Sequence, residues 1–256
     1  MVYDAVKRHL AIEKLVTRVS DEGLERKYYR FRCARWYGGI VTADCVGCGL
    51  LCRFCWVSDE VLYHPAVAGA FYSAESVAEK MQHLARKSGL RQLRLSGGEP
   101  TLGKEHLLRL LELLDNMGYV FILETNGIPL AYDEDFASQL SRRKSVHVRV
   151  SLKGCSESEF AKLTGAMPEN FNLQLKALEK LVEHGVSCHP SVMASFSTRE
   201  NMQLLMEKLA EISRKLAEDL EIEELILYPH VKEKIVKHKL QYYTGYHPNK
   251  VPPEQI

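Results

Sequence analysis

The sequence predicts an α/β fold: an open, partial (β/α)6 TIM-type barrel with an N-terminal leader and a C-terminal tail. Two observations favour this fold. Short apolar segments alternate with amphipathic helical segments, which implies right-handed βαβ units and a parallel sheet. Five such strand segments follow a cysteine-rich loop and one precedes it, too few for a closed eight-stranded barrel. An open doubly wound sheet is the alternative arrangement.

The expected elements divide the 256 residues into three regions. Residues 1–38 are the leader, with a short helix and then an aromatic and basic stretch; 39–230 are the barrel and 231–256 the tail. The strands are expected at 39–43, 92–95, 119–124, 146–152, 186–193 and 223–228. The helices are expected at 74–88, 104–117, 133–143, 169–184 and 199–218. A capping box, Ser197-x-x-Glu200, opens the last helix.

The alternation of residue types within two strands predicts a polar barrel lumen. Between 146 and 153, apolar residues alternate with a polar set that consists of His147, Arg149, Ser151 and Lys153. Outward-facing residues of a barrel strand pack under helices, so the polar set should face the lumen. Ser151 and Lys153 should then lie at the C-terminal rim, where barrel active sites form. The same parity in the next strand turns His189 inward.

Composition and charge argue against several classes of protein. The net charge of +1 gives no general attraction to nucleic acid or anionic lipid. No apolar run reaches the length of about 18 residues that a membrane span needs, and the charged N-terminus does not look like a secretory signal. The basic and aromatic stretch between 26 and 36 could grip RNA, although a solvated leader held down by its aromatic side chains is favoured.

Four of the seven cysteines crowd into residues 45–55, which indicates a metal site in a reduced, cytoplasmic protein. Thiolates are the usual protein ligands of iron–sulfur clusters. Cys48, Cys52 and Cys55, spaced x3 and x2, can fold a short loop around one [4Fe–4S] cube and leave one iron open for a cofactor. The alternatives are a zinc site and a four-cysteine electron-transfer cluster, both with Cys45 as fourth ligand. Zinc sites normally separate their two cysteine pairs by a longer loop.

The cysteine segment and a later glycine motif together resemble the radical S-adenosylmethionine (SAM) superfamily. Cys48-x3-Cys52-x2-Cys55, with Phe54 before the last cysteine, is similar to its cluster-binding signature. Gly97-Gly98-Glu99-Pro100 follows one helix and one strand later, where that family has its glycine-glycine-glutamate-proline motif. The resemblance covers roughly residues 38–230.

Within this superfamily the chain looks most similar to pyruvate formate-lyase activating enzyme-like members. Glu124-Thr125-Asn126-Gly127 resembles their Asp-Thr-Asn-Gly segment, and Ser151-Leu152-Lys153 resembles their Asp-x-Lys segment. This chain replaces the aspartate in both segments. Tyr228-Pro229-His230 looks like the histidine segment of their last strand.

The resemblance implies a [4Fe–4S] cluster on the three cysteines and SAM bound beside it. The Gly97–Glu99 edge, within the motif that ends at Pro100, would receive the methionine ammonium with Glu99 as its acceptor. Lys153 would pair with the methionine carboxylate. The other implied SAM contacts are Asn126, Ser151 and His230 for the ribose and Phe54 for the adenine face.

The implied activity is reductive cleavage of SAM to methionine and a 5′-deoxyadenosyl radical that abstracts hydrogen from a substrate. A flavodoxin or ferredoxin would supply the electron, and no general base is expected. The substrate stays open. It is either a glycyl-radical enzyme, which would make the chain an activase, or a small molecule, a lipid or RNA. A non-enzymatic iron–sulfur or zinc protein is the third class.

Overall fold

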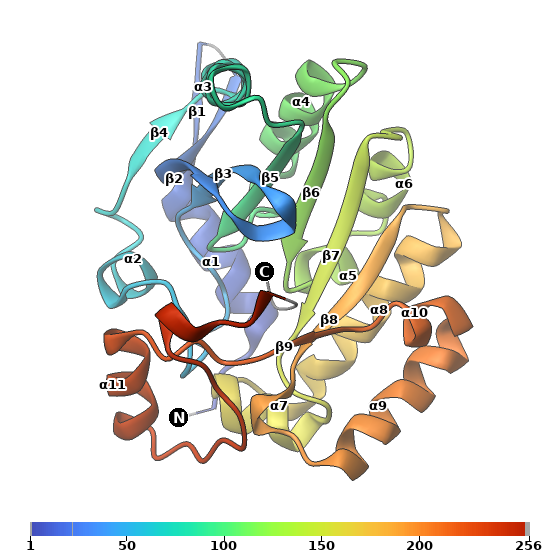
Figure 1. The fold of residues 1–256 in the computed structure, drawn as a ribbon. Coiled ribbons are helices and arrows are strands. Elements are labelled where there is room, and N and C mark those ends of the chain that lie inside the picture. The colour runs from blue at the N-terminus through green and yellow to red at the C-terminus, as the bar shows by residue number, and fades with distance from the viewer. Residues whose placement is uncertain (1, 22, 254–256) are drawn as a thin grey trace.

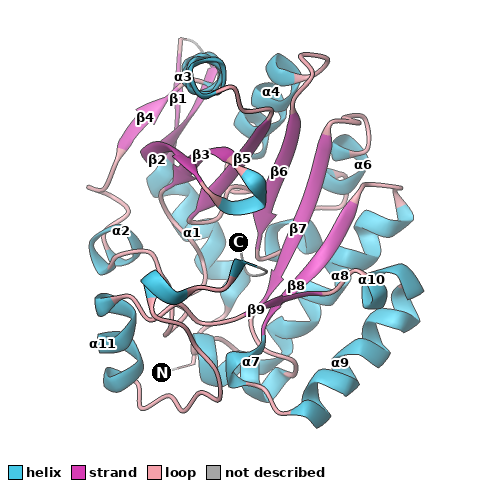
Figure 2. Ribbon diagram, in the orientation of Figure 1, coloured by secondary structure: helices cyan, strands magenta, loops and turns pink. Residues whose placement is uncertain are grey.

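The computed structural model describes residues 2–21 and 23–253 (Figure 1). Its centre is a set of six strands in which each is parallel to the next. In order across the sheet these are β3 (Ile40–Cys45), β5 (Gln92–Gly97), β6 (Val120–Thr125), β7 (Val146–Leu152), β8 (Cys188–Met193) and β9 (Glu221–Glu223). The strands curve around a central space and the path from β1 to β9 does not close (Figure 2). The predicted open α/β barrel with six parallel strands is confirmed.

Helices cover the outer side of this curved sheet (Figure 2). The helices of the described residues are α1 (Ala5–Val16), α2 (Asp59–Tyr63), α3 (Ala74–Ser88), α4 (Lys104–Leu114), α5 (Ile128–Tyr132), α6 (Phe136–Leu140), α7 (Glu157–Thr164), α8 (Phe171–Glu183), α9 (Arg199–Ile212), α10 (Arg214–Glu218) and α11 (Pro229–Lys237). Of these, α2 and α11 lie beside the cysteine loop rather than on the outer side of the sheet (Figure 2). In α3, Val77, Ala78, Met81 and Ala85 form the buried stripe that its period predicts. Gly89, at a φ of 68°, ends that helix in the left-handed conformation.

Apolar and polar side chains of β7 alternate between the core and the lumen as predicted. Val146, Val148, Val150 and Leu152 are buried in the hydrophobic core between the sheet and its helices. Arg149, Ser151 and Lys153 line the inner cavity instead. The lumen side of this strand is therefore polar.

The N-terminal region differs from the expected solvated leader. α1 is the short helix, but the following residues form a hairpin of β1 (Thr17–Ser20) and β2 (Gly23–Ala34), and β2 pairs antiparallel with β3. The short strand β4 (Ala70–Tyr72) pairs with the other part of β2. Only 29–32 alternate aromatic and basic residues with the strand period of two, and a register shift between Tyr28 and Arg30 interrupts the pattern, so the strand was not predicted. Tyr28 is buried, while Arg30 and Arg32 turn inward onto Asp44.

Several element boundaries also differ from the prediction. The helix expected at 133–143 is replaced by the two short helices α5 and α6, and the one expected at 199–218 breaks at Ser213 into α9 and α10. Thr198, not Ser197, caps α9 by accepting a hydrogen bond from the Asn201 amide. The Ser197 hydroxyl instead donates to Glu159 Oε2 at 2.6 Å. Because this distant residue engages the hydroxyl, Ser197 does not cap the helix.

The end of the barrel is shorter than expected. β9 ends at Glu223, whereas the predicted strand ran from 223 to 228. The next segment pairs instead with the C-terminal tail, through an isolated bridge between Ile226 and Tyr246. Of the predicted tail, 254–256 lie outside the described residues.

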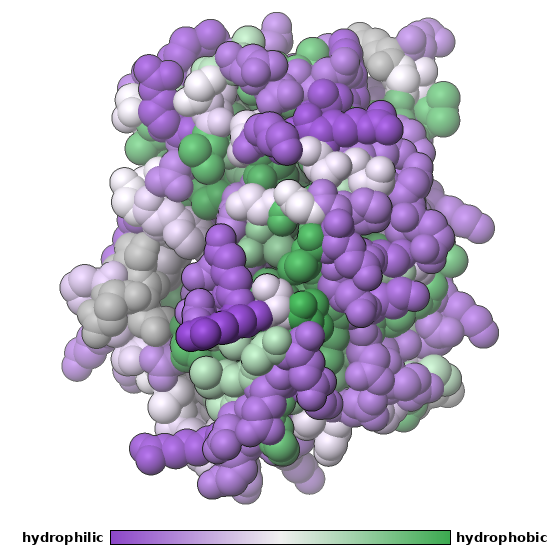
Figure 3. All heavy atoms as spheres, turned by 90° about the vertical axis from the view of Figure 1, so that its right-hand side faces the viewer, coloured by the Kyte–Doolittle hydropathy of each residue, from purple (hydrophilic) through white to green (hydrophobic). Residues whose placement is uncertain are grey.

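No helix in the described ranges is long and apolar enough to cross a membrane. Figure 3 shows the face at the right of Figure 1, where hydrophilic side chains predominate and hydrophobic ones gather toward the middle. This pattern is expected of amphipathic helices, which bury their apolar side and expose their polar side.

Candidate active site

One large cavity lies at the C-terminal ends of the parallel strands. Its volume is about 760 Å³, within the range of about 300 to 1,000 Å³ that is usual for ligand sites. Of the twelve residues predicted to bind a cluster or SAM, eleven line it: Cys48, Cys52, Phe54, Cys55, Gly97, Gly98, Glu99, Asn126, Ser151, Lys153 and His230. Pro100, the twelfth residue, is buried and does not line the cavity.

The cysteine loop follows β3 directly and turns three thiols toward this cavity. The Leu50 amide donates to Cys48 Sγ at 3.4 Å, and the Cys55 amide donates to the Cys52 carbonyl at 3.0 Å. Cys45 differs from these three: it is fully buried in the hydrophobic core and does not line the cavity. Both alternative sites that need Cys45 as a fourth ligand therefore lack that ligand.

The three thiols suit an iron–sulfur cube better than a single metal ion. In the part of the chain that the structure describes, no group of three His, Cys, Asp or Glu side chains is arranged to hold one ion. A [4Fe–4S] cube binds each thiolate to a different iron, which spaces the sulfurs more widely. Three ligands also leave one iron without a protein bond. The donor set therefore fits such a cluster.

Burial raises the pKa of the Cys52 thiol to about 12 and also raises the pKa of Cys48 and Cys55. The ammonium group of Lys153 acts against this at Cys52, and that of Lys234 does so at Cys55. Lys234 also donates to the carbonyls of Cys55 and Val57 at 2.9 and 2.6 Å. A bound metal ion or cluster would favour the thiolate form of these side chains.

The Gly97–Gly98 pair is required by close contact with the cysteine loop. The Gly98 amide donates to the Cys45 carbonyl at 2.8 Å, and the Glu99 amide donates to the Gly47 carbonyl at 2.7 Å. A Cβ at Gly98 would lie 2.3 Å from the Gly47 oxygen, and Gly97 has a φ of 91°. A larger residue would push the two loops apart.

The Glu99 carboxylate accepts four hydrogen bonds from protein donors, three of them at Oε1. Oε1 accepts from the Thr101 amide at 3.1 Å and from the Thr101 and Thr125 hydroxyls at 2.6 Å each. Oε2 accepts from the Asn126 amide at 2.8 Å. This side chain therefore ties the loops after β5 and β6 together.

The Asn126 side chain connects the cysteine loop to helix α1. Its Nδ2 donates to His9 Nε2 at 3.0 Å and to Cys48 Sγ at 3.6 Å, while Oδ1 accepts from the Ile128 amide at 3.0 Å. Burial lowers the pKa of His9, so the neutral ring can donate from Nδ1 to the Ala5 carbonyl at 2.7 Å and accept at Nε2. Sequence reasoning missed His9, which has no local motif.

Gln174 of α8 is a second residue that the sequence did not single out. It is fully buried, and its Nε2 donates to the carbonyls of Asn126 and Ser151 at 2.6 and 3.0 Å. Its Oε1 accepts from the Lys153 amide at 3.1 Å. One amide side chain thereby joins the ends of β6 and β7.

Lys153 and Ser151 form a hydrogen-bonded pair at the rim. Lys153 Nζ donates to the Ser151 hydroxyl, which donates to Glu223 Oε2 at 3.3 Å. Deeper in the lumen, Arg149 pairs with Glu221 and Glu223 at 2.8 and 2.7 Å. Of the predicted lumen histidines, His147 bonds to His189 at 2.6 Å, and neither lines the cavity.

Phe54 and His230 lie on the wall formed by the cysteine loop and the C-terminal region. The Phe54 ring packs against Phe196, with 5.1 Å between the ring centroids. His230 was expected on the last strand, but it lies in the first turn of α11, and its Nε2 bonds to the Trp56 carbonyl at 2.7 Å. The segment Tyr228-Pro229-His230 begins helix α11, because proline is favoured in the first turn of a helix.

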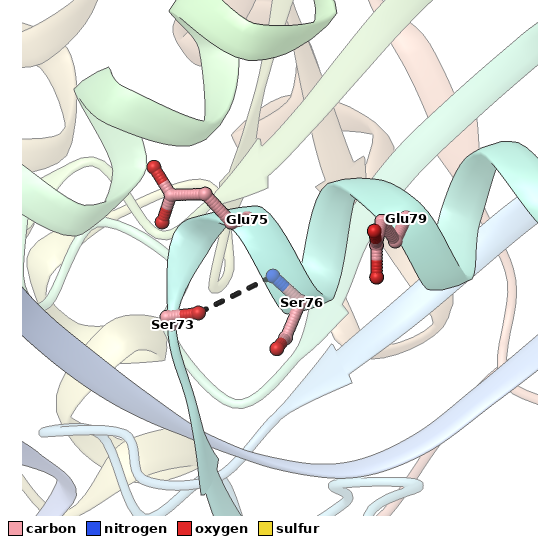
Figure 4. A pocket seen from close by; sticks show the side chains of 4 residues that line it. All are labelled: Ser73, Glu75, Ser76 and Glu79. Carbon is pink, nitrogen blue, oxygen red and sulfur yellow. Dashed lines mark hydrogen bonds between the residues drawn. The ribbon is translucent and has the colours of Figure 1, made fainter. Parts of the chain in front are cut away.

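A second, shallow pocket lies at the start of α3 (Figure 4). Its lining consists of Ser73, Glu75, Ser76 and Glu79. Ser73 caps the helix by accepting from the Ser76 amide, and Glu75 pairs with Arg109 at 2.8 Å. Helix capping explains this pocket.

The comparison with known families decides the class of protein. The family model described as the radical SAM superfamily matches residues 44–209. The chain belongs to the radical SAM superfamily. Its cofactors are accordingly a [4Fe–4S] cluster and SAM, as the sequence predicted.

Relatives of this radical SAM protein span several activities. A "Probable GTP 3′,8-cyclase" of Saccharolobus solfataricus is 30% identical over 104 residues, which cover 40% of this chain and 32% of the relative. One of Methanococcus maripaludis is 27% identical over 180 residues, 70% of this chain and 56% of the relative. A Methanocaldococcus jannaschii protein, named as a glycyl-radical enzyme activating enzyme, is 25% identical over 124 residues, 48% of this chain and 43% of the relative. The chain thus matches about a third to just over half of each relative.

Solved structures share the fold at low sequence identity. SuiB of Streptococcus suis, determined with bound S-adenosylmethionine, has a TM-score of 0.57 and 15% identity, over 82% of this chain and 52% of SuiB. TYW1 with a lysine–pyruvate adduct has a TM-score of 0.53 and 15% identity, over 93% of this chain and 88% of TYW1. The second match extends over most of both chains.

Proposed function

We propose that this radical SAM protein holds its cluster on Cys48, Cys52 and Cys55, binds SAM across the rim of β5 to β7, and acts on a small polar molecule inside the cavity. The observation that carries this proposal is the convergence of the three thiols and the polar rim on one cavity. When bound, the two cofactors supply reductive cleavage of SAM to a 5′-deoxyadenosyl radical that abstracts hydrogen.

The chain's own residues orient SAM in this proposal. The Gly97–Gly98 backbone edge, held by Glu99, faces the methionine ammonium, and Lys153 pairs with the methionine carboxylate. Asn126, Ser151 and His230 contact the ribose, and the Phe54 ring packs on the adenine. The apolar wall around Phe54 excludes water.

Closure of the cavity by both ends of the chain favours a small substrate. Tyr37, just after β2, lines one side, and Tyr246 and Val251 of the tail line another. The inner wall holds the internally paired ions Arg94–Glu124 and Arg149–Glu221. Such a lining suits a polar molecule that fits inside the cavity.

An activase that places a radical on a glycyl-radical enzyme is the second candidate. It is favoured by the similarity to the Methanocaldococcus jannaschii protein and by the Thr125-Asn126-Gly127 segment. In either case a one-electron donor such as a flavodoxin or ferredoxin would reduce the cluster.

Anaerobic reconstitution tests the proposal. We expect about four irons and four sulfides per chain, together with 5′-deoxyadenosine from SAM when dithionite is added. Cys52→Ala should lose both the brown chromophore and the product. Cys45→Ala is the matched control, because this thiol lies outside the cavity, and it should keep the chromophore.

Two results would contradict the proposal. Loss of the chromophore in Cys45→Ala equal to that in Cys52→Ala would indicate a four-cysteine site. Zinc in place of iron after anaerobic purification would exclude the enzymatic assignment for this chain. Formation of a glycyl radical on a partner protein, seen by electron paramagnetic resonance, would select the activase.

A further inference from the structure

One wall of the cavity has no part in the proposed SAM site. Three residues of β2 (Tyr29, Arg30 and Arg32) line it together with Trp56, and we call these four residues the β2 wall. Trp56 follows Cys55 directly, so this wall lies beside the proposed cluster ligands.

Two guanidinium groups of the β2 wall share a single carboxylate. Arg30 Nε and Arg32 Nε both donate to Asp44 Oδ2, at 2.7 and 2.8 Å, and Arg32 Nη2 reaches Oδ1 at 3.4 Å. The Asp44 side chain is fully buried, whereas those of Arg30 and Arg32 are 43% and 24% exposed. One carboxylate neutralises one guanidinium, so one positive charge remains at this wall.

Arg30 uses only Nε for the Asp44 carboxylate. Its remaining nitrogens, in a planar fork, are the groups that bind oxyanions in pairs. Both guanidinium groups lie over the Trp56 ring, at 5.7 and 6.0 Å from its centroid. This stacking fixes their orientation without using their hydrogen-bond donors.

The Tyr29 hydroxyl is a further polar group of this wall and interacts with the neighbouring Arg30 guanidinium. Among the described residues it is one of the buried side-chain oxygens without a hydrogen-bond partner. The Arg30 guanidinium lies 5.5 Å from the Tyr29 ring centroid. A buried hydroxyl without a hydrogen-bond partner is unfavourable, and a bound acceptor would remove that penalty.

Two other cations of the cavity are paired with carboxylates, and Lys153, which bonds to a neutral hydroxyl, is the proposed partner of the SAM carboxylate. Arg94 binds Glu124, Arg149 binds two glutamates, and Lys153 binds Ser151. Once Lys153 is assigned to SAM, the excess positive charge among the described cavity residues lies at the β2 wall.

We propose that Tyr29, Arg30 and Arg32 form an oxyanion subsite that binds a carboxylate or phosphate group of the substrate. This inference rests on the proposed function, because it assumes that a substrate enters this cavity. The subsite would hold the substrate by its anionic end next to the cysteine loop, with the rest of the molecule extending toward the SAM site.

Calorimetric titration of the anaerobic, cluster-loaded protein tests the inference. Inorganic phosphate and succinate serve as the two probes, with SAM in excess so that Lys153 is occupied. We expect at least one probe to bind saturably, and the stronger probe identifies the oxyanion. Tyr29→Phe should weaken its binding about threefold to tenfold and Arg30→Gln about tenfold or more, as loss of a neutral and of a charged hydrogen bond predicts.

These variants should fold normally, so that weaker binding can be attributed to the loss of a contact with the probe. Tyr29→Phe removes only a hydroxyl, and Arg30→Gln leaves Asp44 paired with Arg32. Arg18→Gln, on an arginine that pairs with Glu25 outside the cavity, is the matched control and should bind like the wild type. The cluster absorbance of each variant verifies its fold.

Wild-type affinity in both Tyr29→Phe and Arg30→Gln would overturn the inference, as would the absence of saturable binding by either probe. Failure of the proposed function is a separate result: wild-type protein that incorporates no cluster or forms no 5′-deoxyadenosine. The two failures are therefore distinguishable.

Discussion

Glu99 illustrates how a residue of a predicted motif can also hold the loops around it together. Its place in the glycine-glycine-glutamate-proline motif suggested a direct acceptor for the SAM ammonium. In the structure its carboxylate accepts four hydrogen bonds from Thr101, Thr125 and Asn126. The negative charge lies at the cavity wall, where it favours a cation, and the carboxylate also holds two loops together.

At the same scale, His106 predicts a pH dependence of stability. Burial lowers its pKa to about 4 from an ordinary value of about 6.5. Its ring nitrogens lie 3.0 Å from the Leu24 carbonyl and the Tyr28 hydroxyl. As the pH falls below 6.5, the unfolded chain binds a proton at this histidine and the folded chain does not. The free energy of unfolding is therefore highest above pH 6.5 and falls by about 3 kcal/mol as the pH drops to 4.

Urea unfolding between pH 7 and 4 measures this dependence. His106→Gln should remove that part of the slope, whereas His83→Gln, on the exposed side of α3, should retain it. A slope in His106→Gln equal to that of the wild type would show that other groups cause the acid sensitivity.

Among the elements, α1 contributes most beyond its expected role. It was predicted as part of a leader, yet it supplies His9 to the polar network around the cysteine loop. A Cβ at Gly49 would lie 2.1 Å from His9 Nδ1, so helix and loop are packed together as closely as glycine allows. The residue between Cys48 and Leu50 is therefore constrained by an element about forty residues away.

Replacement of His9 tests this role of α1. His9→Ala should lower the free energy of unfolding by about 2 to 4 kcal/mol, because it opens a cavity and removes the stronger of the two acceptors of the Asn126 amide. Lys7→Ala, on the exposed side of the same helix, should change it by less than about 0.5 kcal/mol. Equal effects of the two substitutions in chemical denaturation would contradict the network.

At the scale of the whole molecule, the N-terminal hairpin and the C-terminal tail add to the two edges of the open barrel. The β1–β2 hairpin extends the sheet beyond β3. The tail extends the other end, where the Tyr246 amide donates to the Leu225 carbonyl at 2.7 Å and the Leu227 amide donates to the Tyr246 carbonyl at 2.8 Å. The cavity is thus bounded by residues more than 200 positions apart.

Removal of the tail after Leu240 tests what the tail contributes to the cavity. The truncated protein loses Tyr246 and Val251 from the cavity wall but keeps all three cluster cysteines. We expect normal iron content after anaerobic reconstitution and a several-fold faster loss of the chromophore in air, because the site becomes more accessible. Equal bleaching rates would show that the tail does not protect the site.

Local sequence patterns were sufficient for a large part of the site. The spacing of Cys48, Cys52 and Cys55 and the Gly97–Pro100 motif each lie within a few residues, and the alternation in β7 reflects a strand period that any half-polar strand must follow. The boundaries of helices and strands were harder to predict from the sequence. Ser197 was expected to cap α9, but its hydroxyl donates to the half-buried Glu159 instead.

The sequence by itself predicted the six parallel strands, the cysteine loop proposed to hold the cluster and the polar side of β7, because spacing and periodicity act between near neighbours. Only the tertiary structure decided that Cys45 faces the core, that His9 and Gln174 support the site, and that the arginines of β2 face the cavity. These facts depend on contacts such as that between His9 and Asn126, which lie 117 positions apart. No local pattern encodes which distant segments the folded sheet brings together.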